Sequence, residues 1–195
     1  GYAEGRVATG STELQNPTAV YKGVDYKLVY DYNYYINKYP DIKAAFNGDE
    51  NATLRHFVEC GMNEGRQGKA SFNVAAYRAN YADLRSAFGR NLKAYYMHYI
   101  GSGYREGRKA TGNGVLKNPV TVYNGVDYSL VYDYNYYISK YSDLKAAFYG
   151  DDTAALRHFV ECGMNEGRQA KDSFNVKKYK LSLIHISEPT RRSYI

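Results

Sequence analysis

Apolar side chains recur at helical spacing in short stretches along this chain. One stretch places them at i, i+3, i+4 and i+7 of a helix: Tyr32, Tyr35, Ile36 and Tyr39. Asp31 comes directly before this stretch and suits an N-cap, because its carboxylate can accept the unpaired amide hydrogens of a first helical turn. Similar short apolar faces follow along the chain. Helices this short are not stable alone in water, so they must pack on one another.

The helical stretches belong to a tandem repeat with a period of 102 residues. Residues 1–6 recur at 103–108, and residues 71–74 recur at 173–176. Each long unit holds two shorter sub-repeats and an insert at residues 111–128. The insert places Asn124-Gly125 between β-forming residues, which predicts a hairpin. Lys22-Gly23 takes this place in the other copy and is a weaker hairpin signal.

These patterns predict a mostly α fold: tandem helical repeats with three short helices per sub-repeat, and a small β-hairpin or strap per 102-residue unit. The expected segments are the end of a truncated repeat (1–10), a linker or strap (11–28), sub-repeat 1 (29–68), sub-repeat 2 (69–110), a second linker or strap (111–128), sub-repeat 3 (129–170) and the start of a truncated sub-repeat 4 (171–180).

The repeat pattern stops at Lys180. Residues 181–195 resemble the translation of a transposase-type sequencing-library adapter, so we expect this tail to be non-native. The first residue also lies inside a repeat. We therefore expect the chain to be a fragment of a longer protein.

Each sub-repeat has an Asp near the start of its second helix and an Arg that ends a Gly-x-x-Glu-Gly-Arg motif. The pairs are Asp41 with Arg66, Asp83 with Arg108, and Asp143 with Arg168. The motif differs from a phosphate-binding loop, since it lacks the Gly-Lys-Ser/Thr ending and follows no strand. We expect its first Gly to be a left-handed helix C-cap and its second Gly to form a tight turn. We expect its Arg to bind the Asp as a structural ion pair, or to bind backbone carbonyls.

Composition and charge narrow the classes of partner. Tyr accounts for 24 of 195 residues and Trp for none, so tyrosine must supply much of the core. The formal net charge is +6, with the charges interspersed and no basic run, so we expect no nucleic-acid partner. No apolar run is long enough to cross a bilayer.

The sequence offers no strong catalytic or metal-binding pattern. One equivalent position recurs as His56, His98 and His158, which favours a packing role. The adjacent carboxylates at two expected helix starts suit solvated N-caps better than the two facing carboxylates of a glycosidase: Asp49 with Glu50, and Asp151 with Asp152. We expect no enzyme activity, catalytic residue, cofactor or metal. Cys60 and Cys162 are expected to be free thiols, with an intermolecular disulfide as the alternative.

Tyrosines outside the apolar stripes are the candidate ligand contacts. Other sub-repeats have a non-aromatic residue at their positions: Tyr34 and Tyr136 align with Ala76, Tyr95 with Thr53, and Tyr104 with Met62. We expect these four rings to be exposed, where they could stack on the apolar face of a sugar or anchor a protein contact. The alternative is that they are scattered surface tyrosines.

Several sequence motifs are rich in tyrosine or glycine, among them Val-Tyr-Asn-Gly-Val-Asp-Tyr-Ser (122–129), Tyr-Asp-Tyr-Asn-Tyr-Tyr (132–137) and Gly-Met-Asn-Glu-Gly-Arg (163–168). They resemble tandem Tyr-rich repeats of secreted proteins from Gram-positive gut bacteria. Such repeats often accompany lysozyme-type glycoside hydrolase, amidase or peptidase domains. The resemblance implies a secreted, surface-associated accessory region and names no ligand.

The expected function is a non-catalytic extracellular module for binding or display, with a cell-wall or host glycan, or a partner protein, as its partner. One alternative is the targeting arm of a peptidoglycan hydrolase whose catalytic domain lies outside this chain. Another is a spacer or protein-interaction scaffold.

Overall fold

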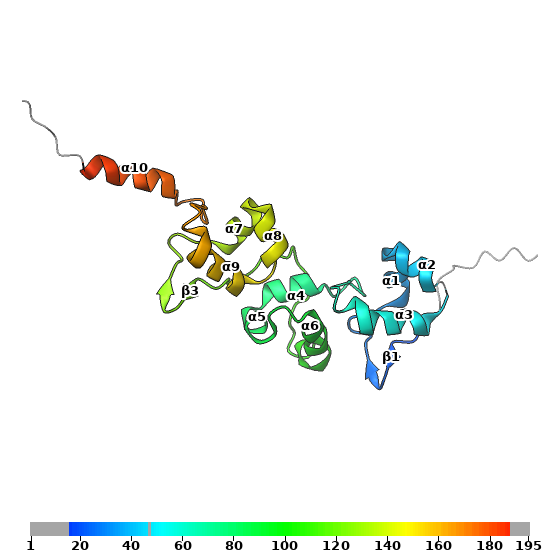
Figure 1. Ribbon diagram of the computed structural model, residues 1–195. Coiled ribbons are helices and arrows are strands. Elements are labelled where there is room, and N and C mark those ends of the chain that lie inside the picture. The colour runs from blue at the N-terminus through cyan, green and yellow to red at the C-terminus, as the bar shows by residue number, and fades with distance from the viewer. Residues whose placement is uncertain (1–15, 47, 188–195) are drawn as a thin grey trace, which may run out of the picture. The chain divides into compact units, whose positions relative to one another are not determined.

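The computed structural model describes residues 16–46 and 48–187 and confirms the expected mostly α fold with small β-hairpins (Figure 1). Sub-repeat 1 forms α1 (Tyr32–Lys38), α2 (Pro40–Phe46), α3 (Glu50–His56) and the π-helical turn η1 (Phe57–Gly61). Sub-repeat 2 forms α4 (Val74–Asn80), α5 (Ala82–Phe88), α6 (Leu92–His98) and η2 (Tyr99–Gly103). Sub-repeat 3 forms α7 (Tyr134–Lys140), α8 (Ser142–Phe148), α9 (Asp152–His158) and η3 (Phe159–Gly163). The last helix, α10 (Val176–Ser187), begins in sub-repeat 4 and continues into the tail.

The described residues divide into two compact units. The first unit comprises residues up to 74 together with 92–111, and the second unit comprises 75–91 together with residues from 112 onward. The boundary falls inside sub-repeat 2. Helix α5 and nearly all of α4 belong to the second unit, whereas α6 and η2 belong to the first.

The first helices of sub-repeats 1 and 3 start where the sequence predicts, because an Asp side chain caps each of them. The Asp31 carboxylate accepts the Tyr34 amide hydrogen at 2.8 Å, and Asp133 does the same for Tyr136 at 2.8 Å. A backbone hydrogen bond then closes each sub-repeat on itself, from the residue before its first helix to a carbonyl after its Gly-Arg motif. These bonds join Asp31 to Gly68, Asn73 to Ala110, and Asp133 to Ala170.

Tyrosine and phenylalanine rings form the core. In sub-repeat 3 the fully buried Tyr137 packs edge-on against Phe159, with 5.5 Å between ring centroids, and Tyr132 lies 5.1 Å from the same ring. The Tyr132 hydroxyl is buried and makes no hydrogen bond within the described residues. Tyr30, its equivalent in sub-repeat 1, shares this feature, whereas sub-repeat 2 has Phe72 at the same position. The core therefore uses the ring and not the hydroxyl there.

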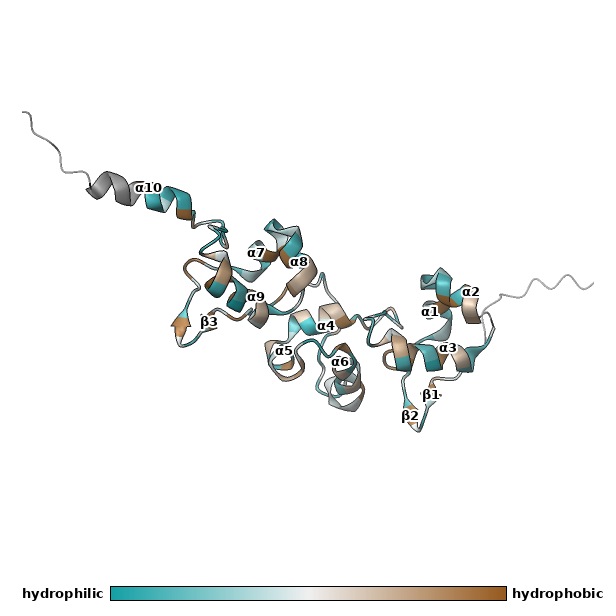
Figure 2. Ribbon diagram, viewed as in Figure 1, coloured by the Kyte–Doolittle hydropathy of each residue, from teal (hydrophilic) through white to brown (hydrophobic). Residues whose placement is uncertain are grey.

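The inserts form two antiparallel hairpins, as the sequence predicts. Strand β1 (Val20–Tyr21) pairs with β2 (Val24–Asp25), and β3 (Val122–Tyr123) pairs with β4 (Val126–Asp127). Both turn residues have positive φ in each hairpin, 49° and 78° at Lys22-Gly23 and 49° and 79° at Asn124-Gly125. The strands carry hydrophobic residues, brown in Figure 2, and three of their valines are more than half exposed: Val20, Val122 and Val126.

The Gly-x-x-Glu-Gly-Arg motif differs in one respect from its prediction. The first Gly is not a left-handed C-cap, because the third helix runs on into the π-helical turn that contains Gly61. A Cβ at Gly61 would lie 2.6 Å from the Tyr35 hydroxyl, so close packing explains the glycine. The second Gly does form a tight turn, with φ of 74° at Gly65 and 69° at Gly167.

In the part of the chain that the structure describes, no helix has both the length and the apolar character needed to cross a membrane.

Candidate functional site

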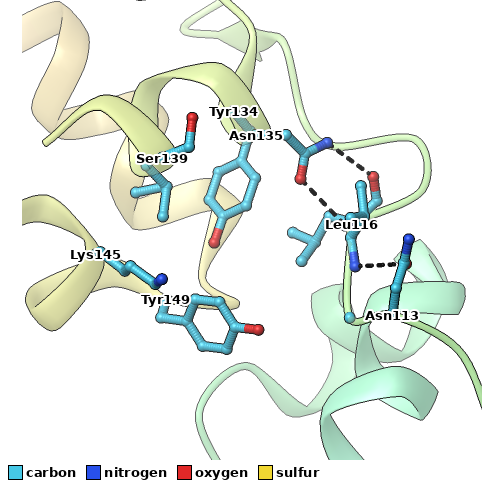
Figure 3. A pocket seen from close by; sticks show the side chains of 10 residues that line it. Asn113, Leu116, Tyr134, Asn135, Ser139, Lys145 and Tyr149 are labelled. Carbon is cyan, nitrogen blue, oxygen red and sulfur yellow. Dashed lines mark hydrogen bonds between the residues drawn. The ribbon is translucent and has the colours of Figure 1, made fainter. Parts of the chain in front are cut away.

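A small pocket in the second unit is a candidate site, because aromatic and polar side chains meet in it. It lies between the strap at residues 113–116, one face of α7, and the end of α8 with the residues after it (Figure 3). Its volume is about 170 Å³. Its lining is mixed, with two tyrosine rings, two asparagines, a serine, a lysine and aliphatic side chains. The pocket thus offers both an aromatic surface and hydrogen-bonding groups in a space for one small ring.

Asn135 on α7 holds the strap in place (Figure 3). Its side-chain oxygen accepts the Leu116 amide hydrogen at 3.2 Å, and its side-chain nitrogen donates to the Leu116 carbonyl at 3.1 Å. The Leu116 side chain is buried in the core of the second unit. Asn113 adds a local turn by accepting the Val115 amide hydrogen at 3.2 Å. The strap wall is therefore fixed before any ligand arrives.

The two tyrosines of the pocket play different parts. The Tyr134 ring is buried, and its hydroxyl donates to the Phe148 carbonyl at 3.1 Å and accepts the Gly150 amide hydrogen at 2.6 Å. Burial raises the pKa of Tyr134 from 10.0 to about 12. Tyr149, in contrast, is 51% exposed. Lys145 and Ser139 are also exposed on the rim. Tyr134 builds the wall, and Tyr149 is the ring that a ligand can reach.

Three of the four predicted ligand tyrosines lie outside this pocket and are accessible to different extents. Tyr34 and Tyr136 are half-buried, and each has a lysine ammonium over its ring, Lys38 at 5.3 Å and Lys140 at 5.0 Å from the ring centroid. Tyr104 is 56% exposed and packs edge-on against a neighbouring ring. Their role in binding stays a prediction.

The fourth candidate, Tyr95, was wrongly predicted to be exposed. Its side chain is fully buried, and so is that of the adjacent Tyr96. Helix α6 therefore buries two successive aromatic rings, although Tyr95 aligns with the non-aromatic Thr53 of sub-repeat 1. A buried ring cannot stack on a ligand in this conformation.

The predicted ion pairs of sub-repeats 1 and 3 form. Arg66 Nη1 lies 2.7 Å from Asp41 Oδ2, and Arg168 Nη1 lies 2.8 Å from Asp143 Oδ2. The Arg66 hydrogen bond lowers the pKa of Asp41 below its usual value. Each guanidinium also stacks on a tyrosine of its own sub-repeat, Tyr39 or Tyr141. Asp83 and Arg108 belong to different compact units, and their pairing stays a prediction.

The recurring histidine has the packing role that the sequence predicts. His56 Nδ1 lies 3.2 Å from the Tyr35 hydroxyl, and His158 Nδ1 lies 3.1 Å from that of Tyr137. His98 contacts the Ser102 hydroxyl at 3.3 Å. Each histidine is thus held by a neutral hydroxyl of its own sub-repeat.

Thiols and carboxylates form no metal site among the described residues. Cys60 and Cys162 are free and exposed. Within the described ranges, no group of three or more His, Cys, Asp or Glu side chains is placed to hold a metal ion.

A buried ion pair is the main feature that the sequence did not reveal. Asp152, expected to be a solvated residue at a helix start, is buried and pairs with the buried Arg85 at 3.2 Å. Its oxygen also accepts the Val120 amide hydrogen at 3.0 Å. The adjacent Asp151 does cap α9, through the Ala154 amide at 3.0 Å. The carboxylate next to the cap therefore ties α9 to α5 and the strap.

Tyr149 is the other residue that sequence reasoning missed. The equivalent position in the first copy is Asn47, so the repeat does not require an aromatic ring there. The same comparison between copies that selected Tyr34 and Tyr104 would also have selected Tyr149.

Comparison of this chain with protein-family models, with curated proteins and with solved structures finds no match.

Proposed function

We propose that this chain is a non-catalytic extracellular binding or display module, and that the pocket beside α7 takes one sugar ring of a cell-wall or host glycan. The observation that carries this proposal is the exposed Tyr149 ring next to polar groups on a fixed wall. A sugar ring has an apolar face that stacks on an aromatic ring and hydroxyls that bind amides and ammonium groups.

The size of the pocket supports a single ring as the occupant. Its volume of about 170 Å³ is below the range of about 300–1,000 Å³ that is typical of small-molecule sites. We expect binding at this pocket alone to be weak, and the first copy does not repeat its aromatic contact, because Asn47 stands in place of Tyr149. Lys145 on the rim favours a sugar that carries a carboxylate or phosphate.

Retention on purified peptidoglycan tests the proposal. The chain should bind the insoluble glycan at low salt, and Tyr149→Ala should weaken binding by roughly tenfold or more, as truncation of a central contact does. Leu130→Ala is the control, because Leu130 is a large hydrophobic residue of the same unit that is 82% exposed and lies outside the pocket. Equal losses in the two variants, or no retention at low salt, would reject glycan binding by this pocket and favour a spacer or scaffold.

A further inference from the structure

An apolar groove in the second unit has an occupied equivalent in the first unit. We call it the η3 groove. It has a volume of about 350 Å³, and its apolar lining includes Val131, Phe159, Met164, Ala170, Phe174 and Val176. One repeat period earlier, the same positions are Val29, Phe57, Met62, Gly68, Phe72 and Val74.

Helix α6 covers this equivalent surface in the first unit. Its Tyr96 ring packs on Phe57 and Phe72, with centroids 5.9 and 5.0 Å away. The Tyr96 hydroxyl donates to the Arg66 carbonyl at 2.9 Å. Leu92, one turn earlier, packs closely on Gly65, where an added Cβ would lie 3.1 Å from it. Aromatic stacking, a hydrogen bond and a close aliphatic contact thus hold α6 on this surface.

A second hydrogen bond also joins α6 to the surface of sub-repeat 1. The Lys93 ammonium donates to the Val58 carbonyl at 2.9 Å, beyond the end of α3. The equivalent residue in the second copy is Val160, on η3. The equivalent of the Arg66 carbonyl is that of Arg168, which also lines the η3 groove. The groove therefore repeats the apolar positions, and Val160 and Arg168 are the sequence equivalents of the two residues whose carbonyls accept from α6.

Equivalent residues are more exposed in the η3 groove than on the surface that α6 covers in the first unit. Met62 is fully buried, whereas Met164 is 39% exposed. Phe72 and Val74 are buried, and their equivalents Phe174 and Val176 are only half-buried. Since these side chains are identical, the difference reflects what covers them, and α6 is part of that cover in the first unit.

We propose that the η3 groove is the docking surface for the third helix of a sub-repeat of the sub-repeat 2 type, joined in cis after α10. Such a helix carries Leu, Lys and Tyr in the pattern of Leu92, Lys93 and Tyr96. It binds the groove as α6 binds the first unit. The first helix of that sub-repeat is already in register, because α10 begins at Val176 as α4 begins at Val74. This contact joins the two sub-repeats of one long unit.

An extended chain tests this proposal. Residues 181–195 are replaced by a second copy of residues 79–110, which continues the repeat register from Lys180. Hydrogen exchange of residues 163–168 is then compared in the parent and extended chains. The proposal predicts at least about tenfold slower exchange of this turn in the extended chain, and a higher midpoint of thermal unfolding. Tyr96→Asp in the appended copy should abolish both effects.

A substitution in the groove supplies an independent readout. Met164→Asp should change the unfolding midpoint of the parent chain little, because the side chain is partly exposed, and should lower that of the extended chain clearly. Unchanged exchange at residues 163–168 in the extended chain overturns the proposal, whether or not the appended segment is helical. Equal effects of Met164→Asp in the two chains also overturn it.

Discussion

Replacing Asp152 with Asn should destabilise the second unit by about 3–5 kcal/mol, because it leaves the Arg85 guanidinium buried without its counter-charge. The two side chains are 4% and 3% exposed. All five N–H donors of Arg85 are engaged. Nε donates to Asp152, and the two terminal nitrogens donate to four backbone carbonyls: those of Arg78, Ala79, Lys117 and Asn118. The expected loss is a large share of the roughly 5–15 kcal/mol that stabilises a typical domain.

The assay must report on the second unit alone, since two compact units can unfold separately. Native-state hydrogen exchange of core amides in α7 and α9, such as those of Ile138 and Leu156, gives the free energy of unfolding for this unit. Asp143→Asn is the matched control. The same chemical change there removes an ion pair whose Asp side chain is 60% exposed, and should cost about 1 kcal/mol or less.

A double variant tests whether the loss of stability comes from an unpaired buried charge. Arg85→Met with Asp152→Leu removes both charges and should be more stable than Arg85→Met alone, because that single variant leaves the Asp152 carboxylate buried without its counter-charge. A loss below about 1 kcal/mol for Asp152→Asn, similar to that for Asp143→Asn, would refute the reasoning that this pair links α5, the strap and α9.

Three further predictions follow from the core, the hairpins and the buried hydroxyls. Tyr132→Phe should stabilise the second unit by about 1 kcal/mol, because it removes a buried hydroxyl without a hydrogen bond among the described residues. Tyr96→Phe should destabilise the first unit by about 1 kcal/mol, because it removes the hydrogen bond to the Arg66 carbonyl. Denaturant unfolding of both variants checks this. Lys22→Asn should raise the stability of the first hairpin by about 0.5–1 kcal/mol, because Asn tolerates the φ of 49° better, and unchanged exchange of the hairpin amides would contradict this. The pKa of Tyr134 rises on folding from 10.0 to about 12, so its contribution to stability is complete below pH 10 and is lost as the pH rises through 12, which tyrosinate absorbance followed alongside circular dichroism can measure.

Local patterns in the sequence predicted most of the fold. The apolar stripe of α1, the Asp31 cap and the Asn124-Gly125 turn depend on residues close to one another in the chain, so they can be read directly. The ion pair of Asp41 with Arg66 was predicted from its recurrence at constant spacing. The repeat therefore revealed a contact between residues that are distant in the sequence, which a single copy would not have revealed.

The errors concern contacts that local patterns do not encode. Gly61 is a glycine because the Tyr35 hydroxyl approaches it closely, and only the packed core reveals this approach. Asp152 looks like a helix-start carboxylate, and its burial depends on Arg85, 67 residues earlier in the chain. Tyr95 is buried in the structure, although its place on the helix suggested an exposed ring. The pocket itself was not predicted, because it forms where the strap meets α7 and α8.

The measurement that tests the central claim most directly is a titration of the isotope-labelled chain with soluble peptidoglycan fragments, followed by NMR. The account predicts saturable shifts confined to the pocket, at Gly114, Asn135, Lys145 and Tyr149, which Tyr149→Ala abolishes while the rest of the spectrum is retained. Absence of shifts at millimolar ligand, or shifts centred on Tyr34 and Tyr136 instead, would contradict it.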